Sequence, residues 1–136
     1  MQLLAPDHRA EANAKLRAIV DRYIRRGFGD YGEKPAERYA AAAAEILSVQ
    51  GQDDRFHLID RLTGGLLQVP RRILEMGCGS AHFLYSSLGR GHDTIGIDVD
   101  YERLRIAELK VDALGLPEAW RERARLGDGQ ALDFPS

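Results

Sequence analysis

The spacing of apolar residues changes in character about halfway along the chain. Before residue 71, apolar positions recur every three or four residues, as they do on one face of a helix. The first such stripe comprises Leu16, Ile19, Val20, Tyr23 and Ile24. Asp7 is the expected N-cap of this helix, because its short side chain can accept a hydrogen bond from a backbone N–H of the first turn.

Two further helices are predicted upstream of residue 71. One has Pro35 in its first turn and ends near Val49. Its inward face comprises Tyr39, Ala43, Ile46 and Leu47. The next helix has Asp53 as its N-cap. Its apolar stripe comprises Leu58, Ile59, Leu62 and Leu66. We therefore expect residues 1–70 to form an N-terminal helical segment that caps the rest of the same domain.

Beyond residue 71, short apolar runs alternate with helical stripes. Strands are predicted at residues 72–76, at 92–100 and around 124–126, and helices at 81–88 and 101–114. The face of the second helix that should cover the sheet comprises Leu104, Ala107, Val111 and Leu114. This alternation predicts an α/β fold, with the N-terminal helices followed by three parallel strands.

The composition is that of an ordinary globular domain. The 136 residues suffice for one domain, with 44% hydrophobic and 29% charged residues. The net charge of −2 provides no field that would attract nucleic acid. Cys78 is the single cysteine, so no internal disulfide can form, which favours a reducing compartment. Because the sequence has no secretory signal and no apolar run of about 20 residues, we expect a soluble cytoplasmic protein without a membrane partner.

The strongest functional signal lies where the first predicted strand meets the following helix. Glu75 lies near the end of that strand, and Gly77 and Gly79 follow it. Glycines allow a sharp turn and the close approach of a ligand, while a helix N-terminus offers unpaired N–H groups. A carboxylate at the end of a buried parallel strand is costly unless it has a partner, which an amine or a sulfonium would supply. The segment therefore predicts a nucleotide-like ligand that carries a cationic group.

Two nucleotide-binding motifs fit this segment to different degrees. The nicotinamide and flavin fingerprint G-x-G-x-x-G/A requires a small residue where this chain has His82, and it serves a pyrophosphate that Glu75 would repel. The pattern E-x-G-x-G over residues 75–79 resembles instead the first motif of class I S-adenosylmethionine-dependent methyltransferases. That family usually has a further glycine where this chain has Ala81.

Two later segments strengthen the resemblance. Asp98 lies 21 residues after Gly77, close to the spacing at which a βαβ unit places an acid on ribose hydroxyls. Residues 126–135 resemble the family's third-strand signature, in which Asp128 would accept a hydrogen bond from the adenine amino group and the backbone of Gly129 would lie beside the adenine ring.

The resemblance covers residues 71–136 and implies the first half of a Rossmann-like methyltransferase sheet, with S-adenosyl-L-methionine bound at the strand ends. The cofactor-binding residues that it implies are Glu75, Gly77, Cys78, Gly79, Asp98, Val99, Asp128 and Gly129. The acceptor would be a small molecule that the sequence does not identify. Methyl transfer depends mainly on positioning, and many enzymes of that family lack an obligatory catalytic side chain, so the catalytic residues are left unassigned.

Other reactive or aromatic residues receive less specific roles. We expect Cys78 to be no nucleophile and His82 to be a capping or surface residue, and the histidines show no metal-ligand spacing. In many relatives, aromatic residues upstream of the first strand fold over the cofactor. Phe28 and Tyr31, in a glycine-rich turn, either form such a lid or pack between the first two helices.

The complete sheet of that family has seven strands, of which the sequence predicts three. We therefore expect an incomplete domain in which the strand at residues 72–76 has an open edge, and such an edge invites self-association or pairing with a second chain. The isolated chain is then expected to be inactive as a methyltransferase. One alternative is a non-catalytic interaction module that docks through this edge, and another is a nicotinamide-binding fragment, which Glu75 and His82 disfavour.

Overall fold

Three N-terminal helices precede a three-stranded parallel sheet in the computed structural model, which describes residues 6–28, 36–47 and 53–130. The helices are α1 (Pro6–Phe28), α2 (Ala36–Leu47) and α3 (Asp53–Leu62). The predictions for Pro35 and Val49, and those for the side chains of Phe28, Tyr31 and Tyr39, lie outside the described residues.

The predicted apolar stripe of α1 is confirmed. Leu16, Val20 and Ile24 are buried, and they pack against Ile106 and Leu109 of helix α5 (Tyr101–Leu114). The exposed positions between them carry mainly polar and charged side chains, so the helix buries one face only.

The N-cap predictions for the first and third helices are wrong by a residue or more. α1 includes Asp7, because Pro6 before it fits the first turn of a helix without losing a hydrogen bond. α3 already begins at Asp53, which was expected just outside it.

The predicted apolar stripe of α3 is largely wrong. Leu58, Leu62 and Leu66 are exposed, Leu62 to 76%. Phe56 is buried in their place, since its ring stacks on Phe83 with 5.9 Å between the centroids. The orientation of α3 therefore follows from the contacts of Phe56 with the rings of Phe83 and His92 rather than from the count of apolar residues along the helix.

The sheet has the strand order β1-β2-β3, and all neighbours are parallel. Its strands are β1 (Arg72–Met76), β2 (Asp93–Asp98) and β3 (Ala124–Leu126). Helix α4 (His82–Gly89) connects the first two, and α5 followed by the short helix η3 (Glu118–Arg123) connects the last two. A second short helix, η2 (Leu66–Gln68), precedes β1. The bounds predicted for β1, α5 and β3 are confirmed.

The second strand is shorter than predicted. It ends at Asp98, because the side chain of Asp100 accepts hydrogen bonds from the backbone N–H groups of Glu102 and Arg103 and thereby caps α5. The register pairs Glu75 with Gly96, and Asp98 with Leu126.

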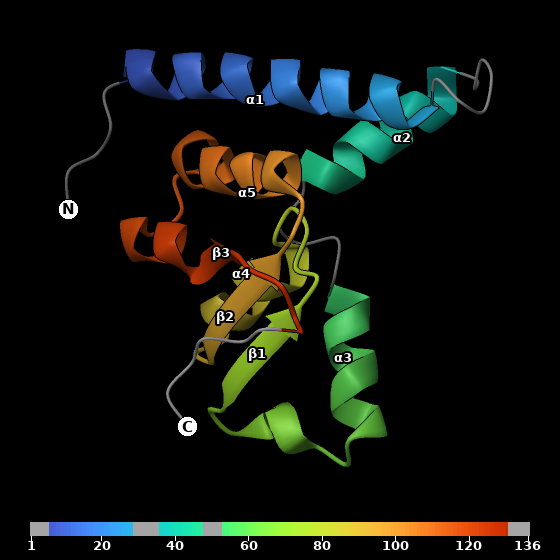
Figure 1. Ribbon diagram of the computed structural model, residues 1–136. Coiled ribbons are helices and arrows are strands. Elements are labelled where there is room, and N and C mark those ends of the chain that lie inside the picture. The colour runs from blue at the N-terminus through green and yellow to red at the C-terminus, as the bar shows by residue number, and fades with distance from the viewer. Residues whose placement is uncertain (1–5, 29–35, 48–52, 131–136) are drawn as a thin grey trace.

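Helix α5 lies between α1 and the sheet (Figure 1). Its residues Ala107 and Val111 pack against α4, while Ile106 and Leu109 pack against α1. Because α5 is covered on two sides, more of it is buried than a single apolar stripe would predict. Leu114, which was expected to face the sheet, is 42% exposed.

The face of the sheet that α4 does not cover carries exposed apolar side chains. Successive residues along β1 point to opposite faces of the sheet. Leu74 and Met76 share one of these faces and are 41% and 58% exposed, whereas Glu75 points to the face that α4 covers. Among the described strands, β1 pairs only with β2, so its other edge has no strand partner in that part of the chain.

Candidate functional site

The turn between β1 and α4 has the tight geometry that its glycines predict. Gly77 and Gly79 adopt φ angles of +75° and +56°, which favour glycine. The backbone N–H groups of Gly77 and Cys78 both donate to the carbonyl oxygen of Ile97, at 2.8 and 3.0 Å. This turn, residues 77–81, is called the glycine loop below.

Ala81 closes the glycine loop in an unusual conformation. Its φ of +69° makes it the only non-glycine residue with a positive φ in the part of the chain that the structure describes. The left-handed region costs a residue with a Cβ about 1–2 kcal/mol. A glycine at this position would adopt the same conformation without that cost.

Glu75 lies beneath the glycine loop with one oxygen unsatisfied. Its Oε2 is buried and accepts no hydrogen bond from any residue that the structure describes. Burial raises the pKa of Glu75 to about 7, although the positive charge of Arg55 partly lowers it and the carboxylate of Asp98 adds to the rise. A buried polar atom without a partner is rare in native proteins and requires an explanation.

Asp98 lies at the end of β2, 8% exposed, and it supports the glycine loop. Its Oδ2 accepts a hydrogen bond from the N–H of Gly79 at 2.8 Å, and its Oδ1 accepts one from the N–H of Asp100 at 2.8 Å. Each carboxylate oxygen retains a second lone pair. The sequence predicted only a role in ligand binding for Asp98, and the structure adds this role in shaping the loop. Val99, the next residue, is exposed.

Asp128 and Gly129 follow the end of β3. Asp128 is exposed, and its Oδ1 accepts a hydrogen bond from the N–H of Gln130 at 2.9 Å. A Cβ placed on Gly129 would lie 2.2 Å from the terminal methyl group of Met76, so this loop passes directly beside the end of β1. The structure thus places Glu75, Asp98 and Asp128 at or just beyond the carboxyl ends of three adjacent strands.

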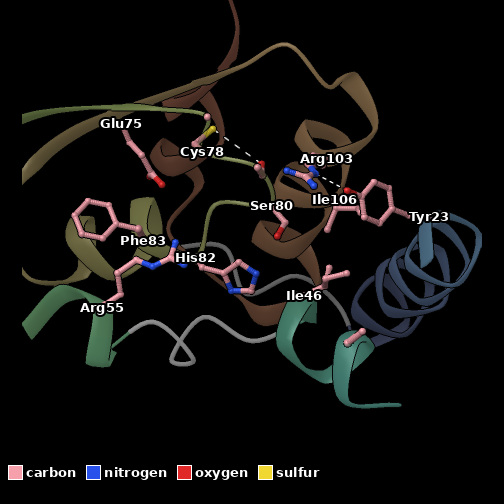
Figure 2. Close-up of a pocket in the computed structure, with 13 residues that line it drawn as sticks. Tyr23, Ile46, Arg55, Glu75, Cys78, Ser80, His82, Phe83, Arg103 and Ile106 are labelled. Atoms are coloured by element: carbon pink, nitrogen blue, oxygen red, sulfur yellow. Dashed lines mark hydrogen bonds between the residues drawn. The ribbon is translucent and has the colours of Figure 1, made fainter. Parts of the chain in front are cut away.

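A pocket of about 430 Å³ opens on one side of the glycine loop (Figure 2). Its floor includes Glu75, Gly77 and Gly79, and the N-terminal helices supply its outer wall. The wall residues are Tyr23 from α1, Ala42 and Ile46 from α2, and Arg55 from α3. The N-terminal helices therefore contribute side chains to the pocket that borders the glycine loop.

Arg103 reaches from the first turn of α5 across the glycine loop to the wall of this pocket. Its Nε donates a hydrogen bond to the hydroxyl of Tyr23 (Figure 2). The same Nε lies 3.7 Å from Oδ2 of Asp100. The bond to Tyr23 raises the pKa of Arg103. Sequence reasoning did not identify Arg103 or Arg55 as site residues. For Arg103, the sequence offered one signal, since this residue lies three positions after Asp100, the cap of the helix that follows β2. For Arg55, the sequence offered no such signal.

Cys78 is unsuited to nucleophilic chemistry. Burial, together with the negative charges of Glu75 and Asp98, raises the pKa of its thiol to about 12. The thiolate, which is the reactive form, is therefore scarce at neutral pH. His82 is the first residue of α4 and lines the pocket, with Ala81 in the N-cap position.

In the described part of the chain, no group of three or more His, Cys, Asp or Glu residues is placed to hold a metal ion. None of the helices within residues 6–28, 36–47 and 53–130 has the length and apolarity that crossing a membrane requires. Comparison with protein-family models, with curated proteins and with solved structures found no match.

Proposed function

We propose that this chain binds S-adenosyl-L-methionine through a Rossmann-like sheet and serves methyl transfer to a small-molecule acceptor. The observation that carries the proposal is the buried Oε2 of Glu75 in the pocket floor, which has no hydrogen-bond partner among the described residues. A cationic ligand group would supply the missing partner, and both the α-ammonium and the sulfonium of this cofactor are cationic.

The surroundings of Glu75 suit an amino acid head group. The pocket that Glu75 lines is also lined by Arg55, whose charge acts on Glu75. An ammonium would interact with the carboxylate, and the ligand's carboxylate would interact with the guanidinium. The two side chains together thus match the zwitterion at the methionine end of the cofactor.

The strand ends next to the glycine loop suit the nucleoside part. The remaining lone pairs of Asp98 can accept hydrogen bonds from a vicinal diol. Asp128 is exposed, and its Oδ1 accepts a hydrogen bond from Gln130, so within the described residues its Oδ2 is available to an adenine amino group. Ligands of open α/β sheets bind in the crevice outside the carboxyl ends of the strands, which is where these residues lie.

When bound, the cofactor would supply an electrophilic methyl carbon on a positively charged sulfur. The contribution of this chain is to bind, to orient and to exclude water. Glu75 and Arg55 would fix the amino acid end, and the glycine loop would allow close approach. Reactive geometry alone can account for a large part of such a rate acceleration. No side chain is assigned to proton transfer.

A titration series tests the proposal. Isothermal titration calorimetry should give a measurable affinity for S-adenosylmethionine and S-adenosylhomocysteine, and a weaker one for methylthioadenosine, which lacks the amino acid head. Decarboxylated S-adenosylmethionine keeps the ammonium, so its loss of affinity relative to the intact cofactor reports on Arg55. Tighter binding of NAD than of S-adenosylhomocysteine would refute the proposal.

Two variants locate the effect. Replacing Glu75 with Gln removes the charge but keeps the shape, and a hydrogen bond to a charged group contributes about 1.5–3 kcal/mol, so Kd should rise about 10- to 150-fold. Glu122→Gln is the matched control, since Glu122 is exposed on η3 and lines a different pocket. Equal affinities for Glu75→Gln and the wild type would exclude Glu75 from the site.

A non-catalytic interaction module is the second candidate function. The exposed Leu74 and Met76 on β1 favour it, because exposed apolar side chains beside an unpaired strand edge are typical of docking surfaces. The titration distinguishes the two candidate functions when it gives a negative result. If none of the adenosyl ligands binds, the interaction module is favoured.

A further inference from the structure

A lysine side chain is completely buried beneath the glycine loop. Lys110 of α5 has an exposed fraction of 0%, and its Nζ donates a hydrogen bond to the carbonyl oxygen of Ser80 at 2.9 Å. Lysine is almost never fully buried, because its charged form loses hydration. Accordingly, burial lowers the pKa of Lys110 to about 7. The burial of the Lys110 ammonium group, which costs hydration free energy, therefore requires a structural explanation.

The hydrogen bond acts on the part of the loop that has the least favourable backbone. Ser80 immediately precedes Ala81, the residue whose φ of +69° would suit glycine. Ala81 is itself fully buried, and its N–H donates to the carbonyl oxygen of Cys78 at 3.0 Å. The peptide between Ser80 and Ala81 is thus fixed from the Ser80 carbonyl by Lys110 and from the Ala81 side by the turn.

The same peptide borders the ligand pocket. Ser80 and Gly79 both line it, and Gly79 is the residue whose N–H donates to Asp98. A shift of the Ser80 carbonyl would move the loop over Glu75 as well. The shape of the site is therefore coupled to a side chain that does not line the pocket.

We propose that Lys110 is a positioning residue, which holds the Ser80 carbonyl so that Ala81 keeps its left-handed conformation and the glycine loop keeps the shape that binds the ligand. The contact between α4 and α5 does not by itself hold the Ser80 carbonyl in place. The hydroxyl of Tyr85 donates to the carbonyl oxygen of Ala107 at 2.7 Å, but this bond joins the helices beyond the loop. A long side chain from α5 is needed to reach Ser80.

The proposal makes Lys110 and Ala81 interdependent, which a purely structural lysine would not be. Lys110→Met removes the donor and keeps an unbranched apolar side chain, so the loop should open more often. Ala81→Gly removes the strain in the loop and should reduce the need for Lys110. In the double variant, the second change should therefore reverse much of the effect of the first.

Amide hydrogen exchange in the ligand-free protein measures this directly. In Lys110→Met, the amides of Gly79 and Ala81 should exchange faster by a factor of about 2–12, the range expected for losing one hydrogen bond. Ala81→Gly should return the rate at Gly79 most of the way to the wild-type value. Leu109→Ala is the control, because Leu109 is buried against α1 and its truncation should accelerate exchange in α1 and α5 rather than in the glycine loop.

Three results would overturn the proposal. One is unchanged exchange of Gly79 and Ala81 in Lys110→Met. Another is acceleration spread evenly over α4 and α5 instead of being centred on the glycine loop. The third is a double variant in which Gly79 exchanges as fast as in Lys110→Met. If Lys110→Met does not fold, the Ala81→Gly variant tests the proposal on its own. It should slow the exchange of the Gly79 amide relative to the wild type, and faster exchange would contradict the proposal.

A second measurement connects the loop to binding, and it rests on the proposed function. The Kd for S-adenosylhomocysteine should rise in Lys110→Met by a similar factor of about 2–12 and recover in the double variant. A wild-type protein that does not bind S-adenosylhomocysteine refutes the proposed function, whereas the exchange rates still decide the role of Lys110. An unchanged Kd in Lys110→Met, with wild-type binding intact, refutes the coupling between Lys110 and the site.

Discussion

The pH dependence of ligand binding provides a sharp test of the part assigned to Glu75. Its folded-state pKa of about 7 applies to the free protein, in which burial favours the neutral carboxylic acid. A cationic ligand interacts with the carboxylate form, so binding must displace the proton. Affinity should therefore be full above pH 7 and should decline as pH falls below it.

The magnitude follows from the pKa alone. Below the pKa, each pH unit reduces the fraction of carboxylate tenfold. Between pH 7.5 and pH 5.5, the Kd for S-adenosylhomocysteine should rise about 20- to 30-fold, provided that Glu75 is ionised throughout in the complex.

The assay is calorimetric titration at several pH values in buffers of different ionisation enthalpy. In the wild type near pH 6, binding should release close to one proton. Glu75→Gln has no carboxyl group at this position and should show a nearly flat dependence, even though Lys110 also titrates near neutral pH. Methylthioadenosine, which lacks the ammonium, should release no proton from Glu75. A wild type as flat as Glu75→Gln, or an equally steep slope in both, would refute the reasoning.

Three further outcomes are expected. Because the folded pKa of Glu75 is raised from 4.5 to about 7, the wild type should lose up to about 3 kcal/mol of stability as pH rises through this window, and Glu75→Gln should lose less in urea unfolding. Gly96→Ala should destabilise the fold by about 1–3 kcal/mol, since the new Cβ would lie 2.5 Å from the Cβ of Cys78. Gly129→Ala is the matched control and should be nearly neutral in the same assay, because the exposed end of the Met76 side chain can move away. Asp98→Ala should weaken S-adenosylhomocysteine binding and also speed exchange of the Gly79 amide, which loses its acceptor.

The order and approximate bounds of the strands and helices were predictable, because each depends on local pattern. Arg72–Met76 is a short apolar run that ends at glycines, and Tyr101–Leu114 is a periodic helix with a capping aspartate before it and a glycine after it. In the structure, Asp100 is this capping residue, since its side chain accepts hydrogen bonds from the backbone N–H groups of Glu102 and Arg103.

The predictions that were wrong or missing concerned features that depend on contacts between distant segments of the chain. The stripe chosen for α3 was wrong because stacking of Phe56 on Phe83, 27 residues away, decides which side of the helix is buried. Likewise, Arg55 and Arg103 approach the glycine loop only once α3 and α5 are packed. The position of Glu75 at the strand end was predictable, whereas the lack of a hydrogen-bond partner for its Oε2 among the described residues appears only in the folded structure.

The burial of α5 on two sides has a consequence for how such a chain can diversify. One side of α5 packs on α1, which forms part of the pocket wall, and the other side packs on α4, which follows the glycine loop. The N-terminal helices therefore cannot be exchanged like a detachable module. A recombinant that brings in a foreign α1 would have to bring in complementary residues at Ile106 and Leu109 as well. Changes of ligand preference in this architecture should thus arise by point substitution along the pocket wall rather than by shuffling of whole segments.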